Sequence, residues 1–155
     1  MAHELMRGVP EDRAKRHLHA AFEFLRSQPS VNKNRIGAIG RCMGGGYSLD
    51  VALDEPALAA AIINYGHLAT GPATLKKSLR FLDCSADRIA ASHPMTSTNS
   101  RGHEATRQGK KIEIKIYDDA GHALENPNNP DGYRPADAAD AWKRTISFLA
   151  ENSKK

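Results

Sequence analysis

Cysteine and aromatic residues are scarce in this chain. Among its 155 residues, 2 are cysteines, 1 is tryptophan, and aromatic residues make up 6%. Two cysteines cannot build the disulfide framework of a small secreted domain, so we expect a reducing, cytoplasmic setting with free thiols. No apolar run approaches the roughly 18 residues of a membrane span, and residues 1–8 are not a signal peptide. These absences predict that the chain has no membrane partner.

The charge pattern also argues against a nucleic-acid partner. The net charge is +4, and the basic residues are scattered rather than gathered in a run with interleaved aromatics. Such a distribution is typical of a solvated surface. The length suits one domain, and neither an internal repeat nor a linker divides it. We therefore predict a single domain over residues 1–155.

Hydrophobic periodicity predicts alternating helices and strands. We expect helices over residues 11–27, from near 43 to 53, and over 136–152, with a weaker helix over 75–78 and strands over 35–40, 57–65, 79–84 and 111–117. The faces expected to be buried are Ala14, Leu18, Ala21, Phe22 and Leu25 on the first helix, and Ala139, Trp142, Ile146 and Leu149 on the last. This alternation predicts an α/β fold, with a mostly parallel sheet of about four strands flanked by helices.

The stretch GRCMGGG, residues 40–46, follows a predicted strand and precedes a predicted helix. Gly40 and Gly44 flank Cys42 in a G-x-C-x-G pattern, which is typical of a nucleophile elbow, where small residues let helix and strand pack closely. A glycine-rich turn around a small buried residue is the alternative interpretation. The run lacks the lysine of a phosphate-binding loop and the G-x-G-x-x-G pattern, so it does not predict a nucleotide cofactor.

Two further reactive residues follow predicted strands, where ligands of a parallel sheet bind. Asp87 comes after strand 79–84 and His122 after strand 111–117. The chain order of nucleophile, acid and histidine is that of α/β-hydrolase triads. We expect His122 to act as base for Cys42, and the Met43 N–H to donate to an oxyanion. Asp87 is the predicted orienting acid, and Asp83, Asp118 and Asp119 stay open as alternatives.

The segments RIGAIGRCMGGGYSL, AAAIINYG, SADR, KIEIKIYDDAGHALENP and YRPADAADAWKRTISFL together resemble the dienelactone hydrolase family of α/β hydrolases. The resemblance runs over almost the whole chain and implies a partial α/β-hydrolase fold. It also implies Cys42 as nucleophile, His122 as base and Asp87 as orienting acid. The implied reaction is hydrolysis of a small ester or lactone through a thioacyl intermediate, with no cofactor. The histidines lack metal-ligand spacing, so we expect no metal.

Departures from the family lead to further expectations. Its members carry additional strands before the helix with which this chain begins, including the loop that donates a second oxyanion N–H. The candidate substrate-binding residues are Arg88 and Asn126, the latter in place of an arginine found in dienelactone-specific members. Strand 35–40 should form an exposed edge, so we expect a homo-oligomer that covers it. The alternative function is a non-catalytic binding or assembly module derived from the triad-bearing half of the fold.

Overall fold

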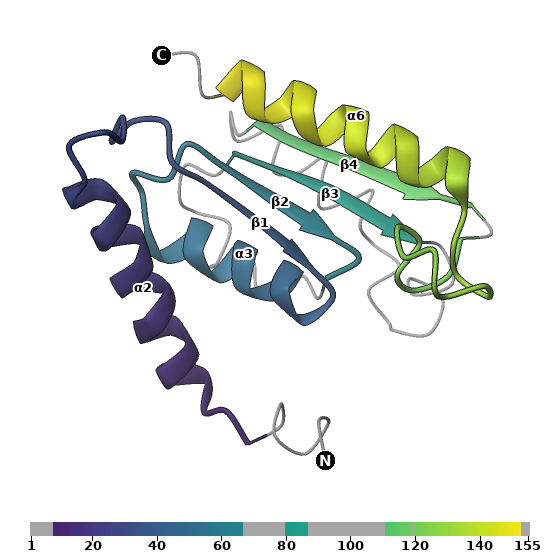
Figure 1. Ribbon diagram of the computed structural model, residues 1–155, viewed down its shortest axis with the longest axis horizontal. Helices are drawn as coiled ribbons and strands as arrows, with labels where there is room; N and C mark the ends of the chain where they lie inside the picture. Colours follow the sequence, from purple (N-terminus) through teal and green to yellow (C-terminus); the bar gives the residue numbers. More distant parts are fainter. Residues whose placement is uncertain (1–7, 67–79, 87–110, 119, 153–155) are drawn as a thin grey trace.

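The computed structural model describes residues 8–66, 80–86, 111–118 and 120–152. The expected helix over residues 75–78 lies outside these ranges. Along the described chain the elements are α2 (Glu11–Ser27), β1 (Gly37–Arg41), α3 (Met43–Asp54), β2 (Ala60–Asn64), β3 (Arg80–Ala86), β4 (Lys111–Tyr117) and α6 (Pro135–Asn152) (Figure 1). The predicted strand over residues 111–117 is confirmed at both ends. Helix α3 starts directly after Cys42, so the predicted helix start near Met43 is confirmed.

The strands form one parallel sheet in the order β1-β2-β3-β4. Ala38 pairs with Ala61, Ile63 with Asp83, and Asp83 with Ile114. All five residues of β2 are buried, as expected for a parallel strand covered on both faces. The predicted α/β fold with a parallel sheet is confirmed. Among the described strands, β1 lies at the edge next to β2, which is the position predicted for this segment.

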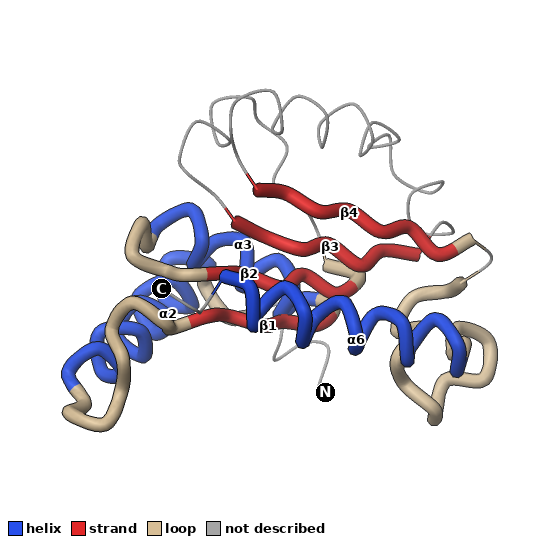
Figure 2. The backbone as a smooth tube through the Cα atoms, turned by 90° about the horizontal axis from the view of Figure 1, so that it is seen from above, coloured by secondary structure: helices blue, strands red, loops and turns tan. Residues whose placement is uncertain are grey.

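Helices α3 and α6 cover opposite faces of the sheet (Figures 1 and 2). The alternation of side chains along β2 divides the core accordingly. Ala60 and Ile62 belong to a cluster with Phe148 of α6, whereas Ala61 and Ile63 belong to a cluster with Leu49 of α3. The carboxyl ends of β1, β2 and β4 consequently lie at one end of a sheet that is held from both sides.

The prediction of the buried face of α6 was wrong for three of its four residues and correct for Leu149. Trp142 is 51% exposed and Ile146 49% exposed, and Ala139 is also exposed. The residues that pack on the sheet are instead Ala141, Thr145 and Phe148, with Leu149 partly buried. Helix α6 carries two adjoining apolar stripes, and the position of the helix over β2 and β3 selects the one led by Phe148. Periodicity identifies both stripes but does not rank them.

The predicted face of α2 was only partly correct. Ala14 and Phe22 are buried, but Ala21 is exposed and Leu25 is 41% exposed. Helix α2 packs against α3 in an outer layer rather than on the sheet (Figure 1). A helix that contacts one neighbouring helix buries a narrower stripe than a helix that lies on a sheet, because a single cylinder covers less of its surface.

Candidate active site

Cys42 occupies a sharp turn between β1 and α3. Its backbone angles are φ 54° and ψ −125°, on the positive-φ side that is costly for a residue with a side chain. The Cys42 N–H donates to the Asn64 carbonyl at 3.0 Å, and the Cys42 carbonyl accepts from the Gly45 N–H at 2.9 Å. The end of β2 and the first turn of α3 therefore hold this strained residue in place, with its side chain exposed.

Close approach of the backbone explains some of the glycines around Cys42. A Cβ on Gly40 would lie 1.8 Å from the Gly44 carbonyl oxygen, so a side chain at position 40 would collide with α3. A Cβ on Gly44 would meet nothing within 4 Å, so the expected steric reason for glycine holds at position 40 and not at 44. Gly45 and Gly66 form a second close contact, since a Cβ on either would come within 2.8 Å of the other residue.

His122 lies in the loop between β4 and α6, which is tied down on several sides. Leu124 is fully buried in the core cluster on the α6 face. The Asn129 side-chain amide donates to the His122 carbonyl at 2.8 Å. Gly132 packs against the same carbonyl, and a Cβ there would lie only 2.3 Å from the oxygen. Ala123 takes up a positive φ of 59°, which directs the chain from His122 into the core.

The structure brings the predicted nucleophile and base together. His122 Nε2 lies 3.0 Å from Cys42 Sγ, although 80 residues separate them in the sequence. The ring of Tyr65 meets the His122 ring edge-on, with centroids 5.3 Å apart and an interplanar angle of 75°. Burial raises the pKa of the Tyr65 phenol, with Glu125 contributing in the same direction, so this ring stays neutral. A thiol and an imidazole at hydrogen-bond distance can exchange a proton.

Met43 is the first residue of α3, directly after Cys42. Its N–H has no intrahelical acceptor, because the first amides of any helix lack one. The helix dipole also favours negative charge at this end. The predicted oxyanion donor is thus placed where an anion beside Cys42 would be stabilised.

The other predicted site residues are only partly described. Asp87 and Arg88, the predicted acid and a candidate substrate-binding residue, lie outside the described residues, as does Asp119. Asp83 lies within β3 rather than at its end, and Asp118 is exposed after β4. The Asn126 side-chain oxygen accepts from the Asn128 N–H at 3.0 Å, which closes a local turn.

A polar bridge that was not predicted lies beside the cysteine and histidine. Glu125 Oε2 accepts from Arg41 Nε at 2.5 Å and from Asn64 Nδ2 at 3.3 Å. The available signal was that Arg41 directly precedes Cys42 and that Glu125 closely follows His122. Because Cys42 and His122 were predicted to meet, the positive charge of Arg41 and the negative charge of Glu125 could have been predicted to pair.

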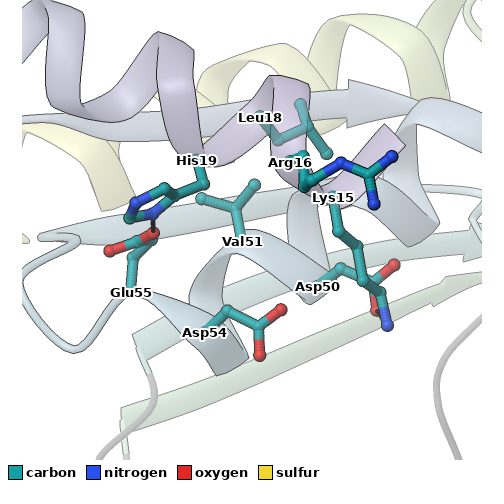
Figure 3. A pocket seen from close by; sticks show the side chains of 8 residues that line it. All are labelled: Lys15, Arg16, Leu18, His19, Asp50, Val51, Asp54 and Glu55. Atoms are coloured by element: carbon teal, nitrogen blue, oxygen red, sulfur yellow. Dashed lines mark hydrogen bonds and ion pairs between the residues drawn. The ribbon is translucent and has the colours of Figure 1, made fainter. Parts of the chain in front are cut away.

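A cavity of about 550 Å³ opens elsewhere, between α2 and α3. Lys15 and His19 of α2 face Asp50 and Asp54 of α3, with Glu55 directly after it (Figure 3). Burial raises the pKa of Asp50, against the opposing effect of Lys15. This cavity lies at the far end of α3 from Cys42, so it is separate from the candidate active site. Among the described residues, no group of three or more His, Cys, Asp or Glu side chains could hold a metal ion.

The fold and the Cys42–His122 pair place the molecule among the α/β hydrolases. The family model of the dienelactone hydrolase family matches residues 1–153. The chain therefore belongs to the dienelactone hydrolase family. In the part of the chain that the structure describes, no helix has the length and apolar character to cross a membrane.

Individual relatives agree with this assignment. The chain is 30% identical over 140 residues to the "Probable 2-oxo-3-(5-oxofuran-2-ylidene)propanoate lactonase" of Bradyrhizobium sp, covering 84% of this chain and 56% of the relative. It is also 30% identical to the "Putative carboxymethylenebutenolidase" of Methylorubrum extorquens, covering 96% and 54%. The chain thus spans little more than half the length of these curated relatives.

Solved structures show the same fold. One is a "Putative Dienelactone Hydrolase" from Klebsiella pneumoniae, with a TM-score of 0.76 and 21% identity over 94% of this chain and 64% of that chain. Another is a dienelactone hydrolase-like promiscuous phosphotriesterase from metagenomic libraries, with a TM-score of 0.72 and 22% identity over 91% and 62%. At this level of identity the likeness concerns the fold, which is that of α/β hydrolases.

Proposed function

We propose that this chain hydrolyses a small carboxylic ester or lactone, with Cys42 as nucleophile and His122 as base. The observation that carries the proposal is the 3.0 Å distance between Cys42 Sγ and His122 Nε2 at the carboxyl end of the sheet. Asp87, directly after β3, is proposed to orient the His122 ring. Membership of a hydrolase family and the lactonase name of one relative support the reaction class.

Cys42, His122 and the Met43 N–H, together with one water molecule, account for each step of the proposed hydrolysis. His122 takes the Cys42 proton, and the thiolate attacks the substrate carbonyl to form a carbon–sulfur bond. The Met43 N–H donates to the oxygen that becomes negatively charged. His122 then protonates the leaving alkoxide as the ester bond breaks, which leaves a thioester on Cys42. A water molecule, deprotonated by His122, attacks the thioester, and the carboxylic acid departs as Cys42 regains its proton.

Release of p-nitrophenol from a short-chain p-nitrophenyl ester tests the proposal. Wild type, Cys42→Ala, His122→Gln and Asp87→Asn should be compared, together with wild type alkylated by iodoacetamide. Loss of a nucleophile or base from a catalytic triad typically lowers kcat by about 10⁴-fold or more. We expect Cys42→Ala and alkylation to abolish release, and we expect a thioacyl adduct on Cys42 by mass spectrometry. Wild-type release no faster than that of Cys42→Ala would instead favour the non-catalytic module.

We also propose that a second copy of the chain covers the edge strand β1. Gly37 faces Leu149 of α6, so Ile39, two residues further on, points to the same face of the sheet and is 45% exposed. Trp142 lies two helical turns from Leu149 on α6 and is likewise exposed. Size-exclusion chromatography with light scattering at tens of micromolar tests this proposal, and a monomer at that concentration contradicts it.

A further inference from the structure

Glu125 is an unusually enclosed carboxylate for a loop residue. Its side chain is 9% exposed, and a carboxylate withdrawn from water is costly unless hydrogen-bond donors surround it. Arg41 and Asn64 provide the donors, at 2.5 Å and 3.3 Å from the same oxygen, Oε2. Asn64 is itself fully buried. Such charge-assisted hydrogen bonds have defined geometry as well as strength.

The two donors come from the segments that shape the nucleophile turn. Arg41 is the last residue of β1, next to Cys42. Asn64 is the last residue of β2, and its carbonyl accepts the Cys42 N–H at 3.0 Å. Glu125 belongs to the loop that carries His122. One carboxylate oxygen therefore joins the histidine loop to both strand ends that position the cysteine.

On the side of β1 and β2, the His122 ring meets the Cys42 thiol and the edge of the Tyr65 ring, and Glu125 adds the charged contact of the loop. The Asn129 amide holds the His122 carbonyl from within the loop, and the Leu124 carbonyl accepts from the Arg134 N–H near the start of α6. These contacts fix the shape of the loop and its attachment to α6, but not its distance from β1. The salt bridge between Glu125 and Arg41 spans that gap directly.

We propose that Glu125 is a positioning residue that, through Arg41 and Asn64, holds the His122 imidazole against the Cys42 thiol. The catalytic consequence rests on the proposed function, whereas the pairing of thiol and imidazole can be measured without any substrate turnover. Because a shift of about 1 Å in a catalytic group can cost on the order of 100-fold in rate, a loosened loop should have a large effect.

A purely electrostatic role for Glu125 predicts the opposite sign. Removing a negative charge near Cys42 would favour the thiolate, so Cys42 would react faster at a given pH. Loss of positioning would instead separate the thiol from its imidazole partner, so Cys42 would react more slowly and would need a higher pH. The direction of the change therefore distinguishes the two roles.

The experiment is alkylation of Cys42 by iodoacetamide as a function of pH, followed by peptide mass spectrometry to separate Cys42 from the buried Cys84. Glu125→Gln is compared with wild type, with Arg41→Gln and with the double variant. Glu113→Gln, an exposed carboxylate on β4, is the matched control. We expect Glu125→Gln to slow alkylation at neutral pH by about 10- to 100-fold and to move the half-maximal rate to higher pH. The double variant should be no worse than Glu125→Gln, because the two residues act as a unit.

If the pH of the half-maximal alkylation rate is unchanged or lower in Glu125→Gln, the proposal is overturned. This holds even if the variant unfolds at a lower temperature than wild type. The proposal is also overturned if the Arg41→Gln variant is alkylated at Cys42 as fast as wild type. With a p-nitrophenyl ester, Glu125→Gln should lower kcat with little change in KM. If wild type shows no turnover but the alkylation profile moves as expected, the proposed function fails and the positioning role stands. If turnover is present and Glu125→Gln changes neither measurement, the positioning role fails alone.

Discussion

Helices α6 and α2 have 18 and 17 residues, and both carry one polar and one apolar face, yet they are held in different ways. Helix α6 lies on the sheet, where Phe148 joins a core cluster that includes Ile62, Leu82 and Leu124. Helix α2 lies against α3, one layer further out (Figure 1).

The polar contacts of the two helices also differ, because α6 is bound by a buried group and α2 by an exposed one. The buried Tyr117 hydroxyl donates to Asp140 of α6 at 2.9 Å, and Asp140 also accepts from Arg144 at 2.6 Å. Across the interface of α2 and α3, the exposed His19 pairs with Glu55. Two helices of similar length and amphipathic character are therefore attached to the rest of the molecule with different strength. We expect α2 to open at a lower free energy than α6.

The largest effect is expected from Phe148→Ala. Phe148 is 2% exposed, so its removal leaves a cavity on the α6 face of the sheet and should lower the free energy of unfolding by about 3–5 kcal/mol. Trp142→Ala on the same helix is the control. Because Trp142 is 51% exposed, its replacement should lower the free energy of unfolding by less than about 1 kcal/mol. Urea unfolding measures both, and a larger loss for Trp142→Ala would refute the observed orientation of α6.

A smaller effect is expected from Phe22→Ala in α2. Phe22 is as well buried as Phe148, at 3%, but its helix packs against α3 rather than on the sheet. We expect a loss on the order of 2 kcal/mol, below that of Phe148→Ala, with faster amide hydrogen exchange confined to α2. Exchange that rises equally in α6 would show that the two helices unfold together.

A contribution of about 1 kcal/mol is expected from the Tyr117 hydroxyl. Burial and the hydrogen bond to Asp140 raise the pKa of Tyr117, while Arg144 and then Tyr117 hold the pKa of Asp140 down. Tyr117→Phe removes one donor from that carboxylate and should shift the urea midpoint downward by the corresponding amount. Tyr47→Phe, on the half-buried tyrosine of α3, serves as the matched control and should change the midpoint less.

The smallest effect is a pH dependence in the attachment of α2. The hydrogen bond to Glu55 raises the pKa of His19 above its ordinary value of 6.5, with Glu23 adding to it and Lys15, Asp50 and Asp54 also facing this interface. A raised pKa means that the folded state binds the proton more tightly. The stabilisation is therefore fully present below pH 6.5 and is lost as the pH rises through the raised value.

His19→Gln should remove this pH dependence, whereas His17→Gln on the same exposed helix should retain it. Urea midpoints at about pH 6 and about pH 8.5 provide the measurement. An unchanged pH dependence in His19→Gln would show that another group anchors α2.

Much of the fold could be predicted because local patterns are strong in it. Strand β4 alternates cleanly between apolar and polar residues, and its bounds were predicted at both ends. The order of Cys42, Asp87 and His122, each after a predicted strand, suggested a hydrolase site before any distance was known. The buried face of α6 could not be predicted, because its two apolar stripes adjoin and periodicity does not say which one meets the sheet.

Local patterns along the chain were enough to predict the α/β class, the glycine turn around Cys42 and the family resemblance, since each of these depends on residues close together in the chain. Packing between distant segments instead determines that Trp142 is exposed, that glycine is sterically required at positions 40 and 45 but not at 44, and that Glu125 joins Arg41 and Asn64. These features depend on which surfaces meet across the sheet. Contacts between residues as distant as 41 and 125 arise from packing, which leaves no local pattern in the sequence.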